Sequence, residues 1–146
     1  MDNALEFLLE QEKTREENAM LALTKARSEL DGYYQQLKQI EQYRLEYCSQ
    51  LVERGKQGLT ASQYGHLNRF LCQLDETLAK QREAESHFIT QVDNCNEHWL
   101  EVRKKRRSYE WLLEKRAKER QIQEEKRDQK QLDEFATQRF TRREMF

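Results

Sequence analysis

The side chains that most often catalyse reactions or bind metals are few in this sequence and lie far apart. The cysteines are Cys48, Cys72 and Cys95, and the histidines are His66, His87 and His98. Their spacings match no zinc-ligand pattern, and there is no histidine cluster to support a cysteine nucleophile. We therefore expect three free thiols, no metal ion and no cofactor.

Motifs that indicate catalysis are also missing from the sequence. It contains no glycine-rich phosphate loop after a strand, no zinc-binding helix motif and no Ser-His-Asp candidate. Paired carboxylates such as Glu16-Glu17 and Glu124-Glu125 lie in charged segments without a predicted pocket to shift their pKa. These features predict a protein that is not an enzyme.

The densest group of charges is the run Arg103-Lys104-Lys105-Arg106-Arg107. Nucleic-acid binding needs basic residues on one face, with aromatic residues available for stacking. Five consecutive helical residues instead distribute their charge around the helix. The run therefore favours an acidic protein surface as its partner, and nucleic-acid binding remains an alternative that predicts steep salt dependence.

Composition favours a long helical protein with two electrically different ends. Charged residues make up 36% of the 146 residues, proline is absent, and the net charge is −1. Residues 101–146 hold 15 Lys and Arg against 10 Asp and Glu, which leaves 11 against 17 for residues 1–100. The acidic N-terminus and the lack of a long apolar stretch predict a cytoplasmic protein with no direct membrane insertion.

Glycines mark a single break in the helical pattern. Three of the four lie at positions 55, 58 and 65. We expect Gly55 to end a first helix of about 3–54, and Thr60 with Gln63 to form a capping box after a turn at 55–60. A second helix is then expected at about 61–140.

Heptad repeats run on both sides of this turn. Eleven of fourteen seam positions are apolar in each helix, and alternating steps of three and four are typical of a coiled coil. The first series is 5, 9, 12, 16, 19, 23, 26, 30, 33, 37, 40, 44, 47 and 51. The second series is 67, 71, 74, 78, 81, 85, 88, 92, 95, 99, 102, 106, 109 and 113.

The two series match each other when the chain folds at the turn. Facing seam positions then add to 118 in every layer, which places Leu51 opposite Leu67 and Glu12 opposite Arg106. The predicted fold is all-α, a long two-stranded antiparallel coiled-coil hairpin that forms one domain, residues 1–146.

This register leaves residues 114–146 as an overhanging C-terminal helix of up to roughly 50 Å. Its continued heptad positions are charged or polar and cannot form a seam. Near its end, Leu132, Phe135, Ala136 and Phe140 recur at helical spacing. A charged helix alone should fray, so we expect this short apolar face to dock on a partner.

Aromatic residues flank the turn on one edge of the predicted hairpin. Heptad letters place Tyr47 and Leu74 at d positions, and Gln36, Tyr43, Phe70 and Thr77 at g positions. In an antiparallel pair the two g rows lie on the same side, so Tyr43 and Phe70 share an edge beside the seam. These residues either widen the core or, because two helices offer no third layer to cover them, form a binding site.

Several of these residues resemble the FliJ family, the coiled-coil component of the bacterial flagellar type III export apparatus. The resemblance covers essentially the whole chain. It includes Tyr43-x-x-x-Tyr47, a turn with Gly58, Phe70-x-x-x-Leu74, Val92-Asp93 and Trp99. Its most specific part is Gln129-Lys130-Gln131-Leu132-Asp133-Glu134-Phe135-Ala136, similar to the family's C-terminal QK-x-hydrophobic-DEFA ending.

The resemblance implies a non-enzymatic stalk. Members of the family form a two-helix coiled coil like the central shaft of rotary ATPases. They enter the ring of the export ATPase hexamer, contact the membrane export gate, and bind and recycle export chaperones. The implied location is the cytoplasm, at the flagellar basal body on the inner membrane.

The resemblance also implies which residues make these contacts. The export-gate surface carries over to Gln36, Ile40, Tyr43, Tyr47, Phe70 and Leu74, while Thr77 and Gln81 continue the row but depart from the family pattern. The shaft analogy implies an ATPase-ring surface at Arg103, Lys104, Lys105, Arg107, Phe135 and Arg139. A generic structural coiled coil that self-associates through its apolar edge remains the alternative.

Overall fold

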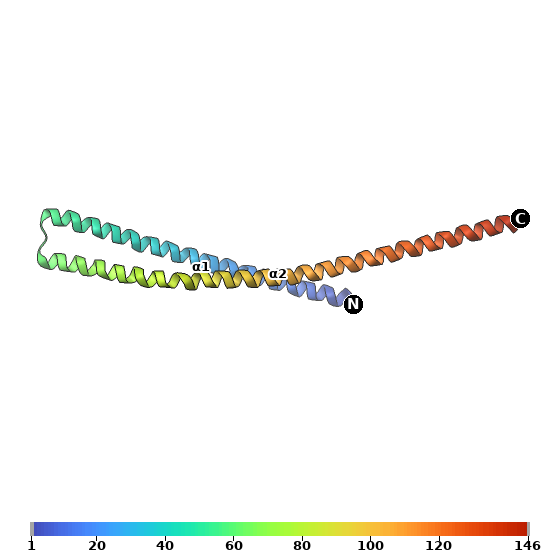
Figure 1. The fold of residues 1–146 in the computed structure, drawn as a ribbon, viewed down its shortest axis with the longest axis horizontal. Coiled ribbons are helices and arrows are strands. Elements are labelled where there is room, and N and C mark those ends of the chain that lie inside the picture. Colours follow the sequence, from blue (N-terminus) through green and yellow to red (C-terminus); the bar gives the residue numbers. More distant parts are fainter. Residues whose placement is uncertain (1, 146) are drawn as a thin grey trace. The chain divides into compact units, whose positions relative to one another are not determined.

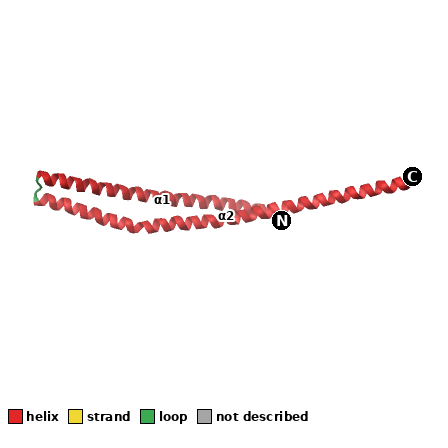
Figure 2. Ribbon diagram, turned by 45° about the horizontal axis from the view of Figure 1, so that its top comes forward, coloured by secondary structure: helices red, strands yellow, loops and turns green. Residues whose placement is uncertain are grey.

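The computed structural model describes residues 2–145, which fold into two long α-helices that pack together. Helix α1 spans Asp2–Gln57 and helix α2 spans Ala61–Met145 (Figure 1). Within these residues the chain contains helix and one short connection, and no strand (Figure 2). The all-α prediction is confirmed; Met1 and Phe146, which the predicted range 1–146 includes, lie outside the described residues.

The connection between the helices begins later than the sequence suggested. Gly55 is helical, and α1 continues to Gln57. Gly58 instead has a φ of 95°, the left-handed conformation that glycine adopts without a Cβ clash. The expectation that Gly55 ends the helix is therefore wrong, because a later glycine supplies the terminal conformation. Helix α2 also runs past the predicted end at about 140.

The capping box at the start of α2 is confirmed. The Gln63 amide donates to the Thr60 hydroxyl oxygen at 3.2 Å, and the Thr60 amide donates to the Gln63 side-chain oxygen at 3.3 Å. These two bonds satisfy backbone donors that the first helical turn leaves unpaired. Residues 58–60 alone therefore reverse the chain direction.

All of the predicted seam positions are buried or half-buried in both helices. Leu23 is fully buried, and Ala19, Ala26, Leu78 and Val102 are nearly so. Cross-helix pairs follow the predicted antiparallel order, since Tyr34 bonds Glu85 and Arg44 bonds Asp75. The residue numbers of each pair add to 119, against the sum of 118 predicted for facing seam positions. Heptad periodicity alone thus located the interface.

The chain divides into two compact units. The turn unit comprises Glu17–Leu100, and the terminal unit comprises the chain up to Glu16 and from Glu101 onward. In the turn unit Tyr33 is buried, its ring stacks on Phe88 with centroids 5.1 Å apart, and its hydroxyl donates to the Gln81 carbonyl. Burial raises the pKa of Tyr33 above the ordinary tyrosine value.

The terminal unit combines an apolar seam, which includes the buried Val102, with several ion pairs. Glu12 is buried and accepts from Arg15 at 2.9 Å and Lys105 at 3.5 Å. Arg106 pairs with Glu16 and, at 2.7 Å, with Glu110. The predicted pairing of Glu12 with Arg106 is therefore wrong, because Arg106 reaches one helical turn further along α1.

The N-terminus of α1 contacts α2 through ion pairs, and the part of α2 beyond Arg116 is exposed. Asp2 pairs with Arg116 at 3.6 Å and with Arg120 at 2.5 Å. Every residue from 117 to 144 is exposed. Within residues 2–145, neither helix contains a segment that is long and apolar enough to cross a membrane.

Candidate protein-binding surfaces

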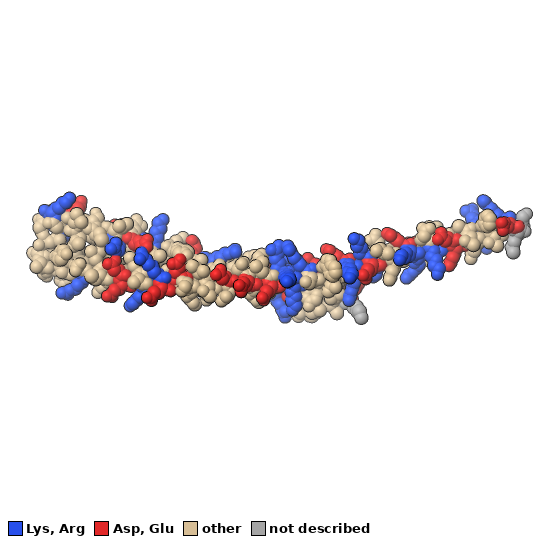
Figure 3. Space-filling view, in the orientation of Figure 1, with Lys and Arg blue, Asp and Glu red and all other residues tan. Residues whose placement is uncertain are grey.

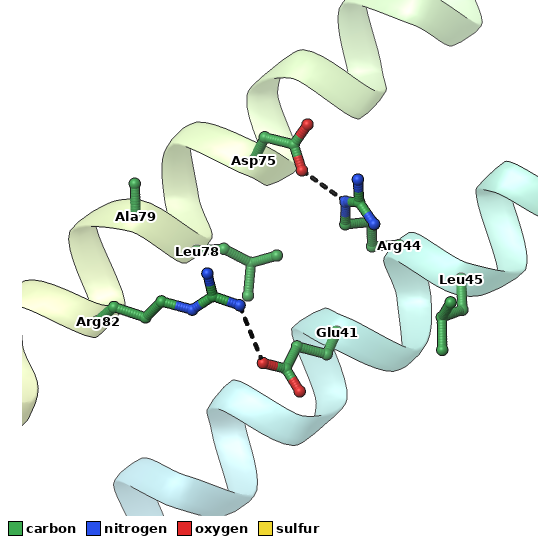
Figure 4. A pocket seen from close by; sticks show the side chains of 7 residues that line it. All are labelled: Glu41, Arg44, Leu45, Asp75, Leu78, Ala79 and Arg82. Atoms are coloured by element: carbon green, nitrogen blue, oxygen red, sulfur yellow. Dashed lines mark hydrogen bonds and ion pairs between the residues drawn. The ribbon is translucent and has the colours of Figure 1, made fainter.

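The turn unit has two edges with different chemistry, and the first is an ion-paired edge. Arg44 pairs with Asp75 at 2.6 Å, and Arg82 pairs with Glu41 at 3.4 Å. Figure 4 shows both pairs bridging the helices beside Leu78. The hydrogen bond that Arg44 donates to Asp75 raises the pKa of Arg44 above its ordinary value. Exposed pairs of this kind contribute about 0–1 kcal/mol each, so they stabilise the pairing modestly.

The opposite edge, which we call the aromatic edge, carries the g-row residues that the sequence analysis singled out. The rings of Tyr47 and Phe70 lie with centroids 4.4 Å apart, a distance typical of a direct aromatic contact. Tyr43 lies one helical turn before Tyr47 and is 54% exposed, while Phe70 is 39% exposed. Two helices therefore leave large aromatic surfaces uncovered here.

The six predicted gate residues divide into two groups of three. Ile40, Tyr47 and Leu74 are half-buried seam residues. Gln36, Tyr43 and Phe70 are exposed. The first group contributes to packing and the second lies beside it, so the seam positions the exposed side chains on a rigid support. Thr77, also exposed, bonds its own helix at the Gln73 carbonyl.

The turn segment next to the aromatic edge carries few charges. Residues 57–68 contain no Asp, Glu, Lys or Arg. On the face drawn in Figure 3, the part of the turn unit next to the connection is mostly uncharged, and charged side chains gather further along the helices. An exposed neutral patch with aromatic residues is typical of a protein interface.

Sequence reasoning missed other exposed apolar residues of the turn unit, and three of them lie in the half of the unit nearer the turn. Leu45 is 66% exposed, Val52 59% and Tyr64 52%. Leu45 follows Arg44 on α1 and lines the same open pocket as the two ion pairs (Figure 4). These residues could have been found by searching for large apolar side chains outside the two seam series.

In the basic run 103–107, Lys105 and Arg106 pair with carboxylates of α1. Lys105 pairs with Glu12, and Arg106 pairs with Glu16. The hydrogen bond that Arg106 donates to Glu16, and next the one that it donates to Glu110, raise the pKa of Arg106 above its ordinary value. Lys104 and Arg107 are exposed, and Arg103 is half-buried. The run therefore does not present five cations on one face, which disfavours nucleic-acid binding.

The C-terminal part of α2 presents an exposed apolar face. Leu132, Phe135 and Phe140 are between 61% and 63% exposed. Arg139 lies 5.9 Å from the centroid of the Phe135 ring, within cation–π range. Asp133, Ala136 and Arg143 line the same shallow surface. Phe135 and Arg139 thus lie together, one helical turn apart on α2.

Comparison with known proteins gives one consistent result. The family model described as Flagellar FliJ protein matches residues 1–145. The chain belongs to the FliJ family. It is similar to Flagellar FliJ protein of Escherichia coli strain K12, with 26% identity over 102 residues that cover 70% of this chain and 69% of that protein. It is also similar to Flagellar FliJ protein of Salmonella typhi, with 24% identity over 133 residues, 91% of this chain and 90% of that protein.

The FliJ match includes all three candidate surfaces. Residues 1–145 contain the aromatic edge, the basic run and the C-terminal apolar face. No solved structure matches the chain significantly. Family membership therefore comes from sequence, and the geometry of the surfaces comes from the structure described above.

Proposed function

We propose that this FliJ-family chain is a non-enzymatic stalk and chaperone escort of the flagellar type III export machinery. Family membership supports a component of the flagellar export apparatus. The observation that carries the finer proposal is the aromatic edge, an exposed neutral patch that rests on a packed seam. Protein binding explains such a patch, whereas a purely structural coiled coil needs no uncovered aromatic residues.

The aromatic edge is the proposed contact with the membrane export gate. Tyr43 and Phe70 supply most of its exposed aromatic surface, and the Tyr47 ring supports Phe70 from the seam. Ile40 and Leu74 lie in the seam beneath the exposed side chains, and Gln36 adds a side-chain amide at the end of the g row. Tyrosine and phenylalanine are enriched where interfaces concentrate their binding energy.

The terminal unit is the proposed insert for the pore of the export ATPase hexamer. Arg103, Lys104, Lys105 and Arg107 would meet acidic groups of the ring. The exposed C-terminal helix would overhang the paired region and dock through Phe135 and Arg139. Flagellar export chaperones are the third class of partner, and the proposed location is the cytoplasmic side of the basal body. The whole chain, 1–146, acts as one hairpin domain in this account.

Paired substitutions on the two edges test the gate contact. We expect Tyr43→Ala with Phe70→Ala to abolish motility, because the exposed rings are lost. Thermal unfolding should shift only modestly from that of the native chain, since Tyr43 is 54% exposed and Phe70, at the edge of the seam, is 39% exposed. The matched control is Leu45→Ala with Val52→Ala, which removes similarly exposed apolar surface from the same unit and should leave motility intact. Loss of the fold in the first variant would show that the aromatic residues belong to the core and would contradict the proposal.

A further inference from the structure

The terminal unit carries a second set of exposed apolar residues that neither the gate contact nor the basic run uses. The same motif, an aromatic residue followed by Leu-Leu-Glu, occurs once in each helix, at residues 7–10 and 111–114. Its first residue is strongly exposed in both copies: Phe7 is 64% exposed and Trp111 is 59% exposed. Its second residue, Leu8 or Leu112, is 37% or 36% exposed. The third residue, Leu9 or Leu113, is half-buried in the seam.

Ion pairs on either side place the two motifs at the same level of the helix pair. Asp2 pairs with Arg116, and Glu12 pairs with Lys105. Between these two anchors, antiparallel pairing brings Phe7 level with Trp111. The four exposed side chains Phe7, Leu8, Trp111 and Leu112, which we call the apolar collar, therefore lie at one level, bounded by charged pairs on both sides.

Heptad positions determine the directions in which the collar residues point. Leu8 and Leu112 occupy g positions and share one edge of the pair. Phe7 and Trp111 occupy f positions, which point away from the partner helix. Because the two helices face each other, their f positions point in opposite directions. The collar thus exposes apolar surface on the back of both helices and on the edge between them.

This arrangement restricts the kind of partner that can cover the collar. A flat surface, or one additional helix, can cover one back or the edge but cannot contact both backs at once. A partner that surrounds the helix pair can contact all of them. We propose that the apolar collar binds an apolar constriction inside a ring-shaped partner, and, resting on the function proposed above, that this partner is the export ATPase ring. The adjacent Lys115, 5.2 Å from the Trp111 ring centroid, would lie at the boundary of the constriction.

Binding of full-length variants to assembled ATPase rings tests the collar. Rings formed with nucleotide are titrated with the native chain, with Phe7→Ala, with Trp111→Ala and with the double variant. Alanine in place of an interface aromatic weakens binding about tenfold, so each single variant should lose about tenfold and the double variant about a hundredfold. Leu45→Ala with Val52→Ala, equally exposed in the turn unit, is the control and should bind within about twofold of the native chain.

Four results would overturn the inference. Native binding by the double variant would show that the collar is not used. Loss confined to one single variant would show a one-sided partner. A native dimer in sedimentation that the double variant abolishes would assign the collar to a second copy of this chain. Failure of the native chain itself to bind rings would remove the proposed ATPase partner, and the collar proposal with it, whereas the first two results leave ring binding intact. Circular dichroism of each variant establishes that its helices are retained.

Discussion

The turn unit and the terminal unit use the same two helices but different interactions. In the turn unit the seam is mostly apolar, with Leu23 fully buried and Tyr33 stacked on Phe88, and its polar positions are Arg44, Gln81 and Glu85. In the terminal unit a buried Glu12 and the half-buried pair Glu16–Arg106 occupy seam positions. Apolar burial stabilises a pairing more strongly than partly exposed ion pairs do. Pairing in the turn unit should therefore contribute more to the stability of the hairpin than pairing in the terminal unit.

The largest expected effect is a loss of stability from the apolar seam. Leu23→Ala removes a fully buried side chain and should lower the free energy of unfolding by about 2–4 kcal/mol, because a cavity remains. Urea unfolding followed by circular dichroism measures this change. Leu21→Ala, at a site that is 68% exposed in the same helix, should cost about 0.5 kcal/mol or less. Equal losses for both variants would mean that the seam assignment is wrong.

An intermediate effect is expected from the polar seam of the terminal unit. Arg106→Ala leaves the carboxylates of Glu16 and Glu110 without their cation and should cost about 1–3 kcal/mol. Hydrogen exchange should report faster opening of the first turns of α1, with the turn unit unchanged. Arg107→Ala, at the neighbouring exposed residue, serves as the control. Faster exchange around Leu23 after the Arg106 change would contradict the separation into two units.

The smallest effect concerns the connection between the helices. Gly58→Ala places a Cβ on a residue with φ of 95° and should destabilise the chain by about 1 kcal/mol. Gly55→Ala, at a helical site where nothing lies within 4 Å of the new Cβ, should stabilise it by about 0.5–1 kcal/mol. Thermal unfolding of the two variants measures the difference. The reverse order of stabilities would restore Gly55 as the end of the helix.

Much of this fold follows from periodicity. Because two-stranded coiled coils repeat every seven residues, the seam could be predicted residue by residue, and all predicted positions are buried or half-buried. The Thr60–Gln63 capping box followed from the same kind of local rule. The choice between Gly55 and Gly58 did not, since both residues can end a helix and the decision depends on the layers that pack beside the turn.

Side-chain partners were less predictable than backbone register. Arg106 has a long flexible side chain and pairs with Glu16 rather than with Glu12 opposite it. Matching seam positions predicts which residues face each other but not which ones a long side chain reaches. The aromatic edge could be predicted as a position, because g rows of antiparallel helices share a side. The exposed fraction of Tyr43 and the contact of Tyr47 with Phe70 required coordinates. Leu45, Val52 and the apolar collar were missed because only seam and edge positions were considered.

The central claim is that this FliJ-family chain is a stalk for the export ATPase ring. Co-sedimentation of the purified chain with ATPase assembled into rings tests it most directly. The account predicts saturable binding at one copy per ring, because one hairpin occupies one central pore. Absence of binding to confirmed rings, or binding of one copy to each ATPase subunit, would contradict the stalk.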